Sequence, residues 1–111
     1  MTANVATAAR TVTLTGQSGK QYTFNVYARS QKFNAIGAVY ALAKIASGKY
    51  VIIYIGQTGD ASNRPFNHHR TACFDRQGAD LVFLLSESSE KRRLEIETDL
   101  IRAYDPPCNK Q

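Results

Sequence analysis

Two stretches near the start of the chain alternate between polar and apolar residues, as strands with one buried face do. Residues 11–15 read Thr-Val-Thr-Leu-Thr, a turn with two glycines follows, and Tyr22, Phe24 and Val26 alternate on the return. This pattern predicts a β-hairpin over residues 11–27. The hairpin carries no residues suited to catalysis, and we expect it either to extend a sheet or to form an interface.

A second pair of strands is richer in apolar residues and is therefore predicted to be buried. Residues 38–45 and 50–55 are mostly β-branched, small or aromatic, and a short glycine-containing turn separates them. With the turn centred on Ser47, Tyr40 falls directly opposite Tyr54, their Cβ atoms about 5 Å apart. A β-bulge in this hairpin would shift that register.

The pattern after the second hairpin predicts a helix, a buried strand and a longer helix. They are expected over about residues 62–76, 81–85 and 89–104. Ser62 is the expected N-cap of the first helix and Ser88 or Ser89 that of the second, while Gly78 and a pair of prolines mark the ends. The order of elements predicts a small α+β domain with a mainly antiparallel β-sheet flanked by helices, to which the N-terminal hairpin is added.

Composition narrows the function classes. The chain of 111 residues is expected to form one domain. Its 14 Lys and Arg against 9 Asp and Glu give a net charge of +5, which suits a polyanionic partner such as nucleic acid. No apolar run is long enough to span a membrane and no signal peptide is evident, so a cytoplasmic protein is expected. Cys73 and Cys108 lack the paired spacing of a zinc site and are predicted to be free thiols.

The last predicted helix carries a carboxylate on its apolar side. Leu94, Leu100, Ile101 and Tyr104 mark the apolar stripe, and Glu97 falls in the middle of it. An ionised carboxylate left unpaired in such a setting costs on the order of several kcal/mol. Glu97 therefore needs a metal, a proton or a cation, and an ion pair with an arginine is the purely structural alternative.

Two short tyrosine motifs precede a set of polar residues at regular spacing. The set consists of Ala38-Val39-Tyr40, Tyr54-Ile55-Gly56, Arg64, His68, Glu97 and Asn109. The arginine follows the second tyrosine by ten residues, the histidine follows the arginine by four, and the asparagine follows the glutamate by twelve. This spacing resembles the GIY-YIG nuclease domain of excision-repair nucleases, homing endonucleases and some restriction enzymes. The resemblance covers about residues 38–109, with Ala38 in place of the first glycine.

The resemblance implies a stand-alone endonuclease that hydrolyses DNA phosphodiester bonds with one divalent ion, Mg²⁺ or Mn²⁺, in DNA repair or recombination. Glu97 would hold the metal, since such hard cations bind carboxylates, water and phosphate oxygens. Arg64 would clamp the scissile phosphate. Tyr40 and Tyr54 would position the attacking water, one of them acting as base with His68 able to take or share the proton.

Further residues complete the expected site. Asn109 would tie the C-terminal segment back to the site and orient a substrate or backbone group. Gly56 marks a place where the backbone passes close to another group. The expected substrate contacts are Gly56, Gln57, Arg64 and His69. His69 adjoins His68, which leaves open which imidazole faces the site, and a zinc site built from both and Cys73 is disfavoured because no fourth ligand is in view.

DNA is the predicted partner, in branched or single-stranded form as well as duplex, and RNA stays open. The sequence contains no appended DNA-reading domain, so specificity is expected from a protein partner, from a second copy of the chain or from DNA shape. No membrane partner is expected. The alternative from another class is a non-catalytic nucleic-acid-binding module on the same fold. Retention of Tyr40, Tyr54, Arg64, Glu97 and Asn109 together favours the nuclease.

Overall fold

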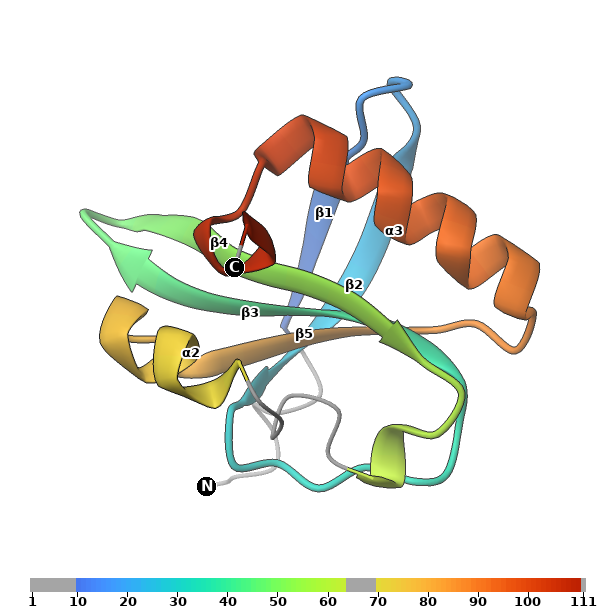
Figure 1. The fold of residues 1–111 in the computed structure, drawn as a ribbon, viewed down its shortest axis with the longest axis horizontal. Coiled ribbons are helices and arrows are strands. Elements are labelled where there is room, and N and C mark those ends of the chain that lie inside the picture. Colours follow the sequence, from blue (N-terminus) through green and yellow to red (C-terminus); the bar gives the residue numbers. More distant parts are fainter. Residues whose placement is uncertain (1–9, 64–69, 111) are drawn as a thin grey trace.

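A computed structural model describes residues 10–63 and 70–110. Within these residues five strands form one antiparallel sheet. They are β1 (Thr11–Thr15), β2 (Gln21–Ala28), β3 (Ala38–Ala46), β4 (Lys49–Thr58) and β5 (Leu81–Ser86). Their order across the sheet is β1-β2-β5-β3-β4, and the sheet turns strongly, so that β1 and β2 stand steeply in Figure 1 while β3, β4 and β5 run across the view. The predicted α+β class with an antiparallel sheet is confirmed.

Helices cover both faces of this sheet. The described elements are the α-helices α2 (Thr71–Gln77) and α3 (Glu90–Tyr104) and the 3-10 helices η1 (Ala61–Asn63) and η2 (Pro107–Lys110). α3 packs on one face through Ile96 and Leu100, and α2 and η2 pack on the other through Phe74 and Cys108. In the described part of the chain no helix is long and apolar enough to cross a membrane.

The N-terminal hairpin extends the sheet, because β2 pairs with β5. Its inward residues lie in the core beneath α3; they are Leu14, Phe24 and Val26. Asp99 of α3 holds the turn of this hairpin, since its carboxylate accepts hydrogen bonds from the Ser18 hydroxyl at 2.7 Å, the Ser18 N–H at 2.8 Å and the Tyr22 hydroxyl at 2.8 Å. These bonds, that of the Ser18 hydroxyl first, lower the pKa of Asp99.

The turn between β3 and β4 differs from the predicted one. It consists of two residues, Ser47 and Gly48, with φ of 52° and 76°. Positive φ at both positions is the geometry of a two-residue hairpin turn whose twist matches that of the strands. A β-bulge then interrupts the ladder at Ile53, which has no residue directly opposite it.

This bulge decides which way Tyr54 points. Ile53 and Tyr54 both face the α2 side of the sheet, whereas the residues on either side of this pair face α3. Tyr40 pairs with Gly56, so the predicted direct opposition of the two tyrosines is wrong. Tyr54 is instead the diagonal neighbour of Tyr40 on the same face, a separation that aromatic side chains span.

The helix predicted to start at Ser62 begins at Thr71 in the described part of the chain, and it ends at Gly78 as predicted, with φ of 79°. Ser62 lies in η1, where its N–H and hydroxyl donate to Oδ1 of Asp60 at 2.9 and 2.5 Å, and the residues that it was predicted to cap lie outside the described residues. Three predicted site residues lie outside the described residues; they are Arg64, His68 and His69.

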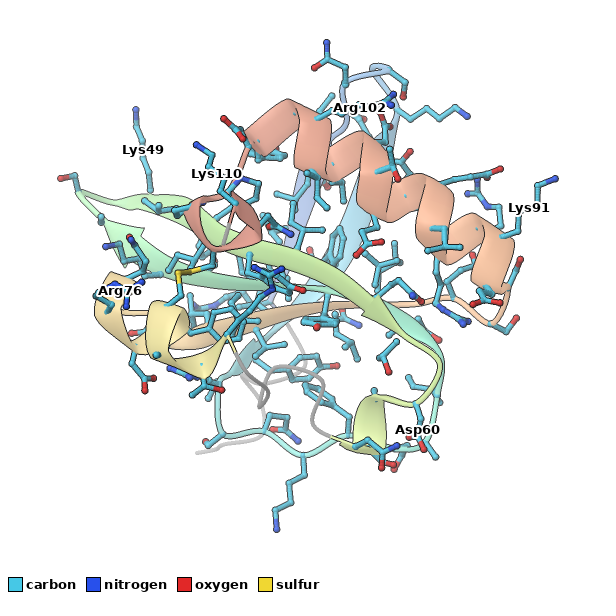
Figure 2. The ribbon with its side chains drawn as sticks, viewed as in Figure 1. Lys49, Asp60, Arg76, Lys91, Arg102 and Lys110 are labelled. Atoms are coloured by element: carbon cyan, nitrogen blue, oxygen red, sulfur yellow. A yellow bond between two sulfur atoms is a disulfide. The ribbon has the colours of Figure 1, made fainter. Side chains whose placement is uncertain are left out.

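Cys73 and Cys108 form a disulfide, which corrects the prediction of free thiols. The bond joins α2 to η2 across 35 residues of chain and is the yellow bond in Figure 2. Both cysteines are buried. Spacing along the chain does not reveal this pair, because the two positions meet only when α2 and η2 pack on the same face of the sheet.

The last strand and helix lie where the sequence predicts them. Ser89 is the N-cap of α3, and its hydroxyl accepts a hydrogen bond from the Arg92 N–H at 3.3 Å. The buried stripe of the helix is rotated from the predicted one: Leu94 is 45% exposed and Tyr104 38%, whereas Arg93 is 7% exposed and Ile96 2%. Glu97 therefore lies at the edge of the buried stripe and is half-buried.

Candidate active site

Tyr40 and Tyr54 lie side by side on the α2 face of the sheet. Their ring centroids are 6.1 Å apart and their planes are inclined by 41°. Tyr40 is buried, whereas Tyr54 is half-buried and also packs on Phe74. A Cβ on Gly56 would lie 2.7 Å from the Tyr40 hydroxyl oxygen and 2.9 Å from the Tyr54 ring. Only glycine leaves room for both rings, and these rings are the close contact that Gly56 makes.

The cation that the described residues place over Tyr54 is Arg70, at the start of α2. Its guanidinium carbon lies 5.5 Å from the centre of the Tyr54 ring, within cation–π range. Its Nη1 donates to the Cys108 carbonyl at 2.6 Å. Sequence reasoning missed Arg70, because its position matches no part of the motif spacing. The only feature of the sequence that pointed to Arg70 was its position directly after two histidines.

Glu97 of α3 lies near enough to both tyrosines for its charge to raise the pKa of their hydroxyls. Burial raises the pKa of its own carboxyl. Across residues 10–63 and 70–110 this carboxylate has neither an ion pair nor a hydrogen bond. The structural alternative, an ion pair with an arginine, is therefore not formed within that part of the chain.

Both tyrosine hydroxyls keep their protons at neutral pH in this environment. Burial is the main cause that raises the pKa of Tyr40 far above its usual range, and the neighbouring Tyr54 and Glu97 raise it further. Burial also raises the pKa of Tyr54, but the Arg70 guanidinium opposes this, as do the hydrogen bonds that the Tyr54 hydroxyl receives from Tyr40 and Arg70. Tyr54 therefore loses its proton more readily than Tyr40, and Tyr40 is suited to donate a hydrogen bond.

Asn109 ties η2 to the edge of the sheet. Its Oδ1 accepts from the Ile55 N–H at 2.9 Å, and its Nδ2 donates to the Ile55 carbonyl at 2.9 Å. The two bonds satisfy backbone groups of edge strand β4 as a further strand would. The side chain thus orients a backbone group one residue from Tyr54 and one from Gly56.

Gln57, a predicted substrate contact, is held by α3. Its Oε1 accepts a hydrogen bond from Nε of the buried Arg93 at 2.9 Å. The structure therefore brings four of the chemically interesting side chains to β4 and its neighbours; they are Tyr40, Tyr54, Arg70 and Glu97. Gly56 makes room for the two tyrosine rings, and Gln57 links β4 to the helix that carries Glu97.

Glu97 offers a single carboxylate as a ligand for a hard divalent cation. Among the described residues no group of three or more His, Cys, Asp or Glu could hold a metal ion. A single half-buried carboxylate supplies one hard oxygen ligand, and Mg²⁺ characteristically keeps several waters and takes phosphate oxygens as well. An ion held by this carboxylate would therefore take most of its ligands from water and a bound phosphate.

Comparison with known proteins identifies no relative: no family model matches the chain, and neither the curated proteins nor the solved structures yield a match. The resemblance to GIY-YIG nucleases therefore rests on the spacing of the motif residues along the chain.

Proposed function

We propose that this protein is a GIY-YIG-type endonuclease that hydrolyses DNA phosphodiester bonds with one divalent metal ion. The observation that carries the proposal is the convergence of Tyr40, Tyr54, Arg70 and a carboxylate without a partner among the described residues, Glu97, from four separate elements. Phosphodiester hydrolysis needs a positioned and deprotonated water, positive charge at the phosphoryl oxygens and stabilisation of the leaving oxygen. These four side chains supply the corresponding groups.

The protein side chains divide this work by their geometry. The Arg70 guanidinium beside Tyr54 offers positive charge to the oxygens of a phosphate bound there. The Tyr54 hydroxyl orients the attacking water, whose proton would pass to solvent, while Tyr40 donates to Tyr54 and fixes it. Glu97 would hold Mg²⁺ or Mn²⁺, which would supply Lewis-acid stabilisation of the phosphate and of the leaving oxygen. Asn109 keeps the edge strand that bears Tyr54 from shifting.

Charge supports a phosphate-centred mode of binding. The net charge is +5, and Lys49, Arg76 and Lys110 lie toward the side of the molecule that carries α2 and η2 (Figure 2). Contacts of this kind position a duplex or single strand without reading its sequence. We therefore propose that structure or shape of the DNA, a protein partner or a second copy of the chain selects the substrate.

A cleavage assay tests the proposal directly. The purified protein is incubated with labelled single-stranded, duplex, branched and flapped DNA, and with matched RNA, in Mg²⁺, Mn²⁺ or chelator. We expect cleavage of at least one DNA substrate with either metal and none in chelator. Tight binding without cleavage in any metal would instead support the non-catalytic nucleic-acid-binding module.

Replacing either Tyr40 or Tyr54 with Phe should slow cleavage by about a hundredfold or more, the scale expected when an acid–base or water-positioning hydroxyl is lost. The ring remains, so stability should change by at most about 1 to 2 kcal/mol, the scale of one hydrogen bond. Cleavage rates and thermal melting are measured in one buffer. Tyr50→Phe is the control, because Tyr50 packs on Phe83 at the α3 face. Unchanged rates with lowered melting would assign the two hydroxyls a structural role.

A further inference from the structure

Arg93 is a buried cation that pairs with no carboxylate among the described residues. Its side chain is 7% exposed, and its three described hydrogen bonds go to neutral oxygens. Nε donates to Oε1 of Gln57 at 2.9 Å, and Nη1 donates to the carbonyls of Ser88 at 2.9 Å and Glu87 at 3.1 Å. Burying a charge with neutral partners alone is unfavourable compared with burying an apolar side chain. A buried arginine at position 93 is therefore expected to have a structural or functional role.

The guanidinium joins three parts of the fold at one point. Gln57 lies near the end of β4, and Glu87 and Ser88 form the connection from β5 to α3. A Cβ on Gly37, just before β3, would lie 2.5 Å from Nη1, so this glycine lets the backbone pass against the guanidinium. The rigid fork of Arg suits such a junction, because several donors point in fixed directions in one plane.

Two neighbours of this junction belong to the candidate active site. Gln57 directly follows Gly56, which makes room for the two tyrosine rings. Glu97 follows Arg93 by four residues on α3, so the two side chains lie one turn apart on the same side of the helix. The hydrogen bond from Arg93 to Gln57 lies one helical turn before Glu97. It therefore fixes the position of α3 along β4 and the rotation of α3 about its own axis at that turn.

We propose that Arg93 is a positioning residue that fixes the position of Glu97 relative to the tyrosine pair by clamping α3 to the end of β4. It acts through Gln57 and does not itself touch the phosphate. This inference deepens the proposed nuclease function and rests on it for the metal-binding role of Glu97. The placement of Glu97 beside the tyrosines is nevertheless measurable without metal or DNA.

The test compares R93K with R92K. Lysine keeps the charge at position 93 but loses the fork and the Nε donor, whereas Arg92 is exposed and pairs with Glu95 at 3.4 Å on the outer side of α3. For R93K we expect the Mn²⁺ affinity of the free protein, measured by electron paramagnetic resonance, to fall by about tenfold to a hundredfold. We expect kcat to fall by a similar factor, which is the usual loss when a residue that orients a metal ligand is replaced. KM for DNA should change little. R92K should match the unaltered protein in all three.

A second readout separates the two proposals. Glu97→Gln should shift the NMR signals of the Tyr40 and Tyr54 rings in the native background and shift them much less in the R93K background. If the native protein neither binds Mn²⁺ nor cleaves DNA while this difference holds, the nuclease proposal fails and the positioning role stands. Equal ring shifts in both backgrounds, or native Mn²⁺ affinity and kcat in a destabilised R93K protein, would overturn the positioning role. If R93K does not fold, Gln57→Leu removes the same contact and is judged by the same criteria.

Discussion

Glu97→Gln should lower metal-dependent cleavage by about a thousandfold, because the amide no longer holds a divalent cation whose stabilisation of the transition state is worth several kcal/mol. The substitution keeps the shape of the side chain at the edge of the α3 stripe. The measurement is single-turnover cleavage at saturating DNA in Mg²⁺ and in Mn²⁺. Glu95→Gln is the matched control, since Glu95 lies two residues earlier and is exposed to solvent. Cleavage at the native rate by the Glu97 variant would refute the metal assignment.

The same variant should not lose stability at neutral pH. Burial raises the pKa of Glu97 above its ordinary value of 4.5, so the folded chain holds the proton more tightly than the unfolded chain does. The stability linked to this group is full below pH 4.5 and is lost as pH rises through the raised pKa of the folded state. Glutamine does not ionise, so thermal melting of the variant at pH 7 should equal or exceed that of the native protein. A clear loss of stability at pH 7 would show that the carboxylate has a stabilising partner.

Loss of the bond between Cys73 and Cys108 should lower the free energy of unfolding by about 4 kcal/mol, the loop-closure entropy expected for a crosslink across 35 residues. Cleavage should fall as well, because η2 carries both the Cys108 carbonyl that binds Arg70 and the Asn109 side chain that pairs with β4. Urea unfolding and cleavage are measured with and without a thiol-free reductant.

The control for that experiment is a variant with both cysteines replaced by alanine. It should unfold at the urea concentration of the reduced native protein, and reductant should not move it. Alkylation of the native protein followed by mass spectrometry provides an independent check, since a disulfide leaves no thiol to react. Two alkylated cysteines in the folded protein, or a urea midpoint unaffected by reductant, would contradict the disulfide.

Local patterns were sufficient to predict the elements of the fold. Strict alternation predicted β1 and β2, apolar runs predicted β3, β4 and β5, and Ser89 was one of two serines expected to cap α3. These signals are local, because strand periodicity and helix caps depend on residues a few positions apart. Tyr40, Tyr54, Gly56 and Glu97 lie on or beside elements whose type was predicted, and their roles stay predictions. The rotation of α3 was predicted only in part, because Arg93 occupies a buried position that hydropathy assigns to an apolar residue.

The sequence by itself determined the type and order of the strands and α-helices and the antiparallel class of the sheet. Only the tertiary structure decided that Tyr54 lies diagonally from Tyr40 rather than opposite it, that Arg70 lies over its ring and that Cys73 meets Cys108. The two-residue turn alone would place the tyrosines on opposite faces, and the bulge at Ile53 reverses this for Tyr54. Each of these outcomes depends on contacts between segments far apart in the chain. The register and packing of whole elements set such contacts, and short-range periodicity does not contain them.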